Sequence, residues 1–340
     1  MNNDIILKVE NLKKLFPVQH GLEALIAKEK KYVHAVDGIS FEVKRGETFA
    51  IIGESGSGKT TTGKLIMRLL EPTDGKIIFN DKDITHIKGK ELKEYRRMCQ
   101  MIFQDPYASM NPRFKIKKVL YEPLIIHRIG DLKYREDLSK ELLRNVKIVP
   151  PEEYLDRFPH MLSGGQRQRV AIARGISLKP QIVVADEPVS MIDLSTRAEI
   201  LAMMRSLQKD MNLTYIYITH DLSTARYFAD RVAVMYLGKI VEMGNIDEVI
   251  DNPVHPYTRT LINAVCEPLP GKVKVFKDIK IKGEIPSAAK IPSGCRFHTR
   301  CLFAKEECWE KEEPQLIDIG NGHSHSCRRY KELPEFVCNK

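Results

Sequence analysis

The stretch "IIGESGSGKTT" at residues 51–61 constrains the fold more than any other part of the chain. It fits the pattern G-x-x-x-x-G-K-[ST], whose fixed positions are filled here by Gly53, Gly58, Lys59 and Thr60. Glycines at such positions let backbone N–H groups turn towards phosphate oxygens, and the following helix directs its positive end at the same anion. An apolar strand-like run precedes the loop and a helix-compatible segment follows it. The pattern therefore predicts a phosphate-binding loop in an α/β protein.

The residue types of this loop suggest individual roles. We expect Lys59 to reach the β- and γ-phosphates of a nucleotide, and the Thr60 hydroxyl to ligate Mg²⁺. The other loop residues expected to contact the nucleotide are Ser55, Gly56, Ser57 and Thr61. A flexible glycine loop without a ligand is the alternative, and the complete pattern disfavours it. The loop alone does not distinguish a kinase, a GTPase, a motor and a transporter.

A second candidate site element is "QIVVADEP" at residues 181–188, an apolar run that ends in acids. It is typical of a buried parallel strand, and ligands bind at the carboxyl ends of such strands. Asp186 suits the Mg²⁺ shell, through water, and Glu187 suits a general base that polarises an attacking water. The alternative is that the two acids cap the next helix.

The stretch "LSGGQ" at residues 162–166 begins a helix-like segment and predicts a second anion-binding helix N-terminus. Its expected nucleotide contacts are Ser163, Gly164, Gly165 and Gln166. One nucleotide does not need two such cradles from one chain, but two chains placed head to tail could each complete the other's site. With the phosphate loop, "LSGGQ", "DEP" and "TH" in this order, the sequence resembles the ATP-binding subunits of ABC transporters.

This resemblance implies roles for further residues. Gln104, in "MIFQDPY", matches the family's Q-loop glutamine, which touches Mg²⁺ or the attacking water and reports to the membrane partner. His220, in "YITHD", matches the switch histidine that contacts the γ-phosphate. "SMID" stands where the family usually has "SALD": Ser190 and Asp193 match, whereas Met191 and Ile192 depart from it. The departure leaves the cross-talk between two nucleotide sites open.

The aromatic residue that stacks on adenine is less certain from the pattern. Tyr32 is the closest fit to the family's position before the phosphate loop. Phe16 is the rival, because residues 17–31 resemble an insertion ahead of Tyr32. An ordinary aromatic at a strand edge is the third interpretation of Tyr32.

Strands and helices alternate along most of the 340 residues, which predicts a parallel sheet with helices on its faces. The resemblance implies an α/β fold: a RecA-like parallel-sheet core, an N-terminal antiparallel β subdomain and a helical signature subdomain at about 106–175. The ATPase domain is expected to span residues 1–250, and prolines punctuate an appendage at 251–340. No apolar run approaches the roughly 18 residues of a spanning helix, and the start does not resemble a secretory signal. We therefore expect a cytosolic polypeptide.

Two longer stretches resemble one branch within this family. "FQDPYASMNPR" at 103–113 and "HPYTRTLINAV" at 255–265 resemble the dipeptide and oligopeptide importer branch, and "NPR" resembles its second, F-type ATPase subunit. The resemblance implies ATP and Mg²⁺ as ligands. It also implies a second ATPase subunit as partner (or a homodimer in isolation), two permease subunits at the cytoplasmic face of the membrane, and indirectly an extracytoplasmic solute-binding protein, with no nucleic acid. The alternatives are a soluble ABC-type ATPase acting on ribosomes or DNA, and importers of sugar oligomers or nickel.

The net charge of +9 is scattered along the chain, which indicates a solvated surface, with proximity to a membrane surface as the functional alternative.

Four of the seven cysteines gather in the appendage with the spacing C-x5-C-x6-C-x18-C: Cys295, Cys301, Cys308 and Cys327. In a reducing compartment clustered cysteines more often hold a metal than a disulfide. Zinc ribbons prefer C-x2-C pairs, which are absent here. Some members of the importer branch carry a [4Fe–4S] cluster in a similar segment, so the resemblance implies such a cluster. Zn²⁺ and reduced structural thiols are the alternatives.

Three histidines and three further cysteines are not expected to be ligands. The neighbouring histidines His298, His323 and His325 are expected to be surface residues. Cys99, Cys266 and Cys338 lie outside the four-cysteine motif.

Overall fold

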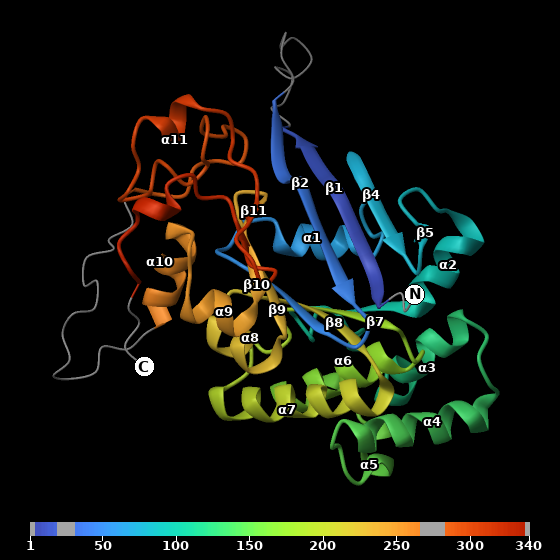
Figure 1. Ribbon diagram of the computed structural model, residues 1–340. Helices are drawn as coiled ribbons and strands as arrows, with labels where there is room; N and C mark the ends of the chain where they lie inside the picture. The colour runs from blue at the N-terminus through green and yellow to red at the C-terminus, as the bar shows by residue number, and fades with distance from the viewer. Residues whose placement is uncertain (1–3, 19–30, 266–282, 337–340) are drawn as a thin grey trace, which may run out of the picture. The chain divides into compact units, whose positions relative to one another are not determined.

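The computed structural model describes residues 4–18, 31–265 and 283–336 (Figure 1). The chain forms two compact units. The first unit comprises residues 1–43, 49–86 and 219–340, and the second comprises residues 44–48 and 87–218. None of the described helices is long and apolar enough to cross a membrane.

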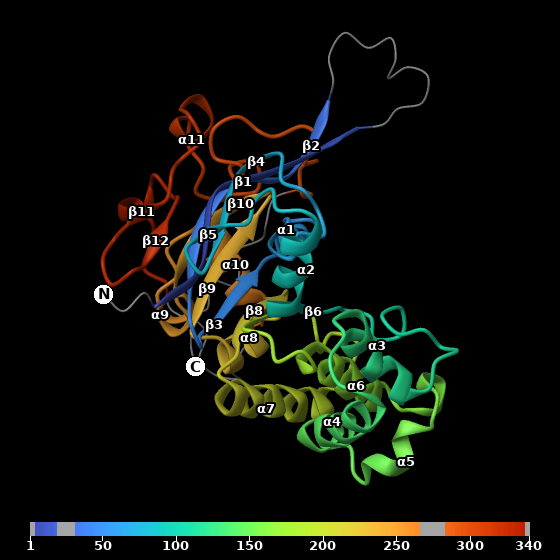
Figure 2. The ribbon, with the colours of Figure 1, turned by 90° about the vertical axis from the view of Figure 1, so that its right-hand side faces the viewer.

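The first unit contains an antiparallel sheet with the strand order β2-β1-β4-β5, seen from its edge in Figure 2. The bounds are Ile5–Pro17 for β1, Tyr32–Lys44 for β2, Asp74–Phe79 for β4 and Lys82–Asp83 for β5. Side chains alternate between the two faces of β1, which buries Leu7 and Val9 opposite Phe79 and Ile77 of β4. This sheet confirms the predicted antiparallel subdomain.

The first unit also contains the strand order β11-β12-β10-β9-β3. The bounds are Thr48–Ile52 for β3, Arg231–Tyr236 for β9, Lys239–Asn245 for β10, Ile317–Asp318 for β11 and Ser324–His325 for β12. β3 and β9 are parallel, and β10 pairs antiparallel with both β9 and β12. The helices of this unit are α1 (Lys59–Ile66), α8 (Leu222–Phe228), α9 (Ile246–Asp251), α10 (Pro256–Val265), α11 (Glu307–Glu310) and the 3₁₀ turn Tyr330–Glu332. The appendage thus adds two strands that the sequence analysis did not predict.

The second unit contains three parallel strands in the order β8-β7-β6. Their bounds are Cys99–Ile102 for β6, Ile182–Asp186 for β7 and Thr214–Thr219 for β8. All five residues of β7 are buried, which confirms the buried strand expected from "QIVVAD".

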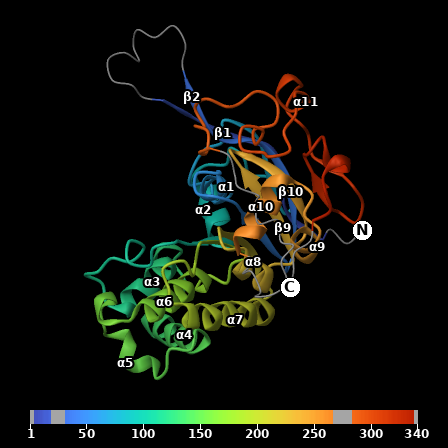
Figure 3. The ribbon, with the colours of Figure 1, turned by 90° about the vertical axis from the view of Figure 1, so that its left-hand side faces the viewer.

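The helices of the second unit gather beside one another, as Figure 3 shows for α3 to α7. Their bounds are Gly89–Met98 for α2, Ile116–Ile126 for α3, Leu132–Asn145 for α4, Pro151–Leu155 for α5, Pro159–Met161 for the 3₁₀ turn, Gly164–Ile176 for α6 and Leu194–Met211 for α7. Three of them begin at side-chain caps: Asp131 accepts from Tyr134 N–H at α4, Ser163 caps α6, and Asp193 caps α7. Helices α3, α4, α5 and α6 form the predicted helical subdomain.

Candidate nucleotide site and cysteine-rich extension

The phosphate loop connects β3 to α1 in the first unit, and two of its glycines cannot be replaced without a collision. Gly53 has a φ of +152° and Gly58 a φ of +106°. A Cβ atom on Gly53 would lie 2.2 Å from the carbonyl oxygen of Met235, and one on Gly58 would lie 2.2 Å from that of Ala35. The loop is therefore pressed against β9 and β2, and only glycine allows both this backbone conformation and this approach.

The Lys59 side chain lies back over its own loop. Its Nζ donates to the carbonyl oxygens of Gly53 at 2.8 Å and of Glu54 at 2.9 Å. Helix α1 begins at Lys59 without a side-chain cap, so its first N–H groups point into the loop in the manner of an anion-binding N-terminus. The hydroxyl of Ser57 is buried and has no hydrogen-bond partner among the described residues. These features suit a polyphosphate ligand.

The remaining predicted residues of the phosphate loop are placed around this helix N-terminus. Ser55 and Gly56 are exposed at the tip, whereas Thr60 and Thr61, in the first turn of α1, are half-buried.

The acidic end of β7 lies in the second unit. Asp186 is the last residue of the strand and is only 4% exposed. Glu187 has the unusual positive φ of +46°, and its N–H donates to Ile218 of β8 at 2.8 Å. The Nε2 of Gln104 donates to Oε2 of Glu187 at 3.0 Å. The structure thus brings together the predicted base and the predicted Q-loop glutamine, and the strained backbone at Glu187 is typical of a functional position.

The "LSGGQ" stretch forms the N-terminus of α6, as predicted. Ser163 Oγ accepts from Gln166 N–H at 3.2 Å, and Gln166 Oε1 accepts from Ser163 N–H at 3.0 Å, which is a reciprocal capping box. Gly164 and Gly165 line a pocket of about 220 Å³ together with Asp193. The mutual hydrogen bonding of Ser163 and Gln166 is a finding of the structure that the motif pattern does not predict.

Asp193 stands at the N-terminus of α7. Its Oδ1 accepts from Ser195 Oγ at 2.7 Å and from Thr196 N–H at 3.0 Å. These hydrogen bonds, that from Ser195 foremost, lower the pKa of Asp193 to about 2. A Cβ on Gly165 would lie 2.8 Å from Thr196 Cγ2, so the signature glycine and the Asp193 turn are in close contact.

Two more predicted residues lie in the first unit. His220 follows β8 and is exposed. Tyr32 begins β2 and is 37% exposed, while Phe16 is half-buried near the end of β1. The N–H of Val18 donates to Lys31 O at 2.9 Å, so the two aromatics stand where β1 and β2 meet the expected insertion, of which residues 19–30 lie outside the described residues. Tyr32 and Phe16 both remain candidates for the adenine contact.

The four predicted cysteines converge in the extension. One pocket is lined by all four thiols and by His255, Phe297 and Leu333 among others. Its volume of about 20 Å³ is room for one water molecule. As the side chains stand, no group of three or more His, Cys, Asp or Glu residues within the described part of the chain is close enough to hold a metal ion.

Three of these thiols are weakened as acids by their surroundings. Burial raises the pKa of Cys295 and Cys301 to about 11 and that of Cys327 to about 12, and the charges of the neighbouring thiolates add to the rise. A metal centre that binds here must therefore displace protons.

The prediction of surface histidines in the extension was wrong for two of the three. His323 and His325 are buried, and only His298 is half-exposed. His323 Nε2 lies 2.8 Å from Oε1 of the buried Glu242, and the ring of His325 packs on Tyr330. β12 pairs with β10, and this pairing carries both side chains into the interior, a long-range effect that local polarity does not reveal. Cys99 is buried in β6, and Cys266 and Cys338 lie outside the described residues.

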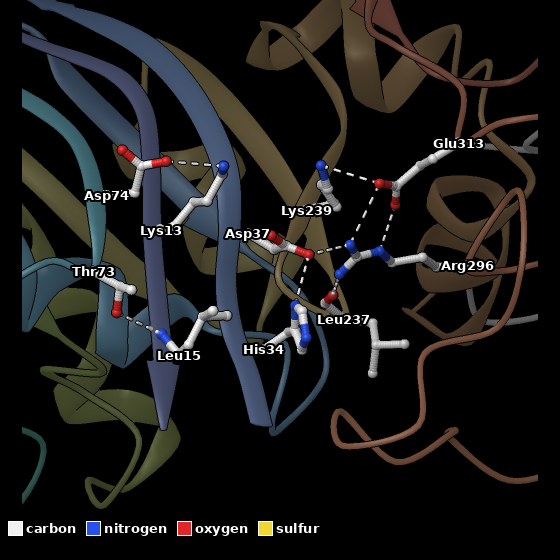
Figure 4. Close-up of polar contacts among 10 residues, drawn as sticks. All are labelled: Lys13, Leu15, His34, Asp37, Thr73, Asp74, Leu237, Lys239, Arg296 and Glu313. Atoms are coloured by element: carbon white, nitrogen blue, oxygen red, sulfur yellow. Dashed lines mark hydrogen bonds and ion pairs between the residues drawn. The ribbon is translucent and has the colours of Figure 1, made fainter. Parts of the chain in front are cut away.

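Sequence reasoning also missed the arginines of "CRFHTRC" at 295–301. Arg296 Nη2 donates to Asp37 Oδ2 at 2.5 Å and its Nη1 donates to Leu237 O at 2.6 Å, while Nε donates to Glu313 (Figure 4). Lys239 completes this network through Glu313 at 3.1 Å. The only hint in the sequence is two cations four residues apart between two cysteines.

Comparison with known proteins agrees with this geometry. Residues 36–190 match the family described as "ABC transporter", and residues 241–308 match "Oligopeptide/dipeptide transporter, C-terminal region". The chain is 44% identical over 331 residues to the oligopeptide transport ATP-binding protein AppF of Bacillus subtilis, covering 97% of this chain and 98% of that protein.

This chain belongs to the ABC transporter family of transport ATP-binding proteins. It is also 43% identical to the dipeptide transport ATP-binding protein DppF of Haemophilus influenzae, over 96% of this chain and 97% of that one. A solved dimeric structure of the ATP-binding cassette MJ0796 with ADP and phosphate matches with a TM-score of 0.62 and 28% identity, covering 71% of this chain and 99% of that cassette. The ABC cassette fold predicted from the motifs is confirmed, and the protein is an ATPase coupled to transport.

Proposed function

We propose that this ABC-family ATPase is one of two ATPase subunits that drive uptake of di- or oligopeptides. Both subunits would act at the cytoplasmic face of the membrane. The observation that carries the proposal is the phosphate loop: glycines pressed against β2 and β9, Lys59 held over the loop and an uncapped α1. Identity of 44% to an oligopeptide transport protein supports the peptide substrate.

Each predicted residue has a proposed task. Lys59 and the loop N–H groups hold the phosphates, and Glu187 takes the proton of the attacking water while Gln104 orients it. His220 contacts the γ-phosphate, and Tyr32 or Phe16 packs on the base. The catalytic contribution is mainly positioning and charge stabilisation.

Mg²⁺ suits the oxygen donors of Asp186, Thr60 and Gln104, of which Asp186 is a buried carboxylate at a strand end. When bound, Mg²⁺ neutralises the charge that develops on the transferred phosphoryl group.

We propose that the pocket at Ser163, Gly164, Gly165, Gln166 and Asp193 serves the nucleotide of a partner ATPase subunit. Two permease subunits receive the motion, and a solute-binding protein outside delivers the peptide. We expect no nucleic-acid partner.

A direct test combines hydrolysis with localisation. Glu187→Gln should lower ATP turnover by about 10²–10⁴-fold while ATP binding persists. The wild-type chain should pellet with membranes only when the permease subunits are present. Unchanged turnover in Glu187→Gln would refute the catalytic assignment, and membrane-independent fractionation with ribosomes or DNA would refute the transporter role.

We also propose that the four cysteines hold a [4Fe–4S] cluster. Support comes from their shared pocket, since thiolates are the usual ligands of such clusters. A cluster is larger than one water molecule, so binding would require the lining side chains to move. Iron and sulfide analysis of anaerobically purified protein tests this: about four of each per chain supports the cluster, and zinc alone or no metal refutes it.

A further inference from the structure

One arginine in the stretch between Cys295 and Cys301 forms an ion pair with the phosphate loop. Arg300 Nη1 donates to Glu54 Oε2 at 2.7 Å, and Nη2 donates to Oε1 at 3.1 Å. Arg300 is 6% exposed, while the Glu54 side chain is 25% exposed. A two-pronged pairing of this kind fixes the orientation of the carboxylate as well as its position.

Helix α10 holds the backbone of the same glutamate. Glu54 N–H donates to the hydroxyl of Tyr257 at 2.8 Å, and Tyr257 is fully buried. Glu54 is the first variable residue of the phosphate loop, and its carbonyl oxygen accepts from Lys59 Nζ. The residue that the C-terminal extension holds is therefore also a residue that holds the phosphate-binding lysine.

The extension is also bound to parts of the first unit other than the phosphate loop, so it can support the loop. Arg296 bonds Asp37 of β2 and the carbonyl of Leu237, as Figure 4 shows. Between the two arginines, Phe297 packs with ring centroids 5.3 Å from Tyr236 and 5.4 Å from Tyr257. Three residues within the stretch 296–300 thus contact β2, β9, α10 and the phosphate loop.

The charge of Glu54 gives this contact a consequence for nucleotide binding. An unpaired carboxylate in a phosphate-binding loop repels the polyphosphate, and in a partly buried site this repulsion is screened weakly. Arg300 offsets that charge by pairing with both carboxylate oxygens. A displacement of the loop by about 1 Å is enough to reduce a reaction by about 100-fold.

We propose that Arg300 and Tyr257 are positioning residues of the ATP site, through which the cysteine-rich extension sets the geometry and charge of the phosphate loop. Nucleotide affinity then depends on the contacts of Glu54 with Arg300 and Tyr257. The inference rests on the ATPase function stated above.

Titration of the full-length protein with Mg²⁺ and a fluorescent ATP analogue tests the proposal, together with KM, kcat and thermal unfolding. Arg300→Gln should raise Kd and KM by about tenfold, equivalent to about 1.4 kcal/mol, with a smaller change in kcat. The double variant Glu54→Gln/Arg300→Gln should recover part of the loss because it removes the unpaired charge. The exchange Glu54→Arg/Arg300→Glu should recover part of it by restoring the pair.

A matched control is Arg329→Gln, which removes another buried arginine of the extension. Arg329 pairs with Glu332 at 2.7 Å and with Glu307 at 3.3 Å. This variant should lower the unfolding temperature and leave the Kd for the analogue unchanged. Equal loss of thermal stability in both arginine variants with wild-type Kd in both would overturn the proposal.

Tyr257→Phe keeps the test decisive if Arg300→Gln does not fold. It removes one hydroxyl without changing the packing volume, and should raise Kd by about threefold, since one neutral hydrogen bond is lost. A wild-type Kd in folded Tyr257→Phe then overturns the proposal. Absence of nucleotide binding in the wild type would instead refute the ATPase assignment itself.

Discussion

Gly58→Ala should strongly weaken nucleotide binding, and the structure indicates how far the phosphate loop must move. The new Cβ atom would lie 2.2 Å from Ala35 O, whereas ordinary contacts begin near 3.4 Å, so the loop must move from β2 by about 1 Å. In addition, alanine at a φ of +106° costs about 1–3 kcal/mol in backbone strain. Together these effects should reduce ATP turnover by about 100-fold or more.

The assay is steady-state ATP hydrolysis alongside binding of a fluorescent ATP analogue and thermal unfolding. Gly89→Ala is the matched control, because Gly89 also has a positive φ, +55°, but its Cβ would meet no atom within 4 Å. The control should lose some stability and keep wild-type affinity. Wild-type affinity in Gly58→Ala would show that contact with β2 does not hold the loop rigidly in place.

Further variants separate chemistry from folding. Glu187→Gln should lower kcat by about 10²–10⁴ with nucleotide affinity retained, as a lost general base does; comparable kcat would exclude that role. Ser163→Ala should cost about 1 kcal/mol in urea unfolding, because Gln166 N–H loses its cap. Phe297→Ala should cost about 3–5 kcal/mol by the same method, since the ring is 2% exposed among aromatic neighbours; a loss below 1 kcal/mol would contradict the packing. Burial, foremost, and the charges of His325 and Arg259 lower the pKa of His255 from 6.5 to about 3. The unfolded chain therefore binds the proton first, so stability should fall as pH drops from 6.5 towards 3. His255→Asn should flatten that slope in unfolding curves measured across this pH range.

The parts predicted correctly from sequence are those whose determinants are local. Helix α6 begins where "LSGGQ" predicted it, because Ser163 and Gln166 are three residues apart and cap each other. The strand β7 was visible as an apolar run, and its terminal acids followed from parallel-sheet geometry. The glycine positions of the phosphate loop were likewise predicted from one short sequence pattern.

What the sequence did not reveal depends on distant partners. The pairing of Arg300 with Glu54 spans 246 positions, and no spacing rule connects them. β12 is two residues long and has no measurable periodicity, yet it places His323 against Glu242. Local polarity alone predicts that the histidines of a segment such as "GHSHS" are exposed. That prediction is wrong for His323 and His325 because it does not include the strand pairing.

The pairing of β10 with β12 also protects a sheet edge. Glu242 and Met243 of β10 face His325 and Ser324, so the extension covers backbone groups that would otherwise be open to another chain. Open edges recruit further strands, and proteins usually block them. A chain shortened after α10 would therefore be expected to self-associate through β10, with a concentration-dependent elution volume in size-exclusion chromatography. If the shortened chain stayed monomeric at all concentrations, β10 would not need this cover. The short strand just before Cys327 would then also keep neighbouring cassettes apart.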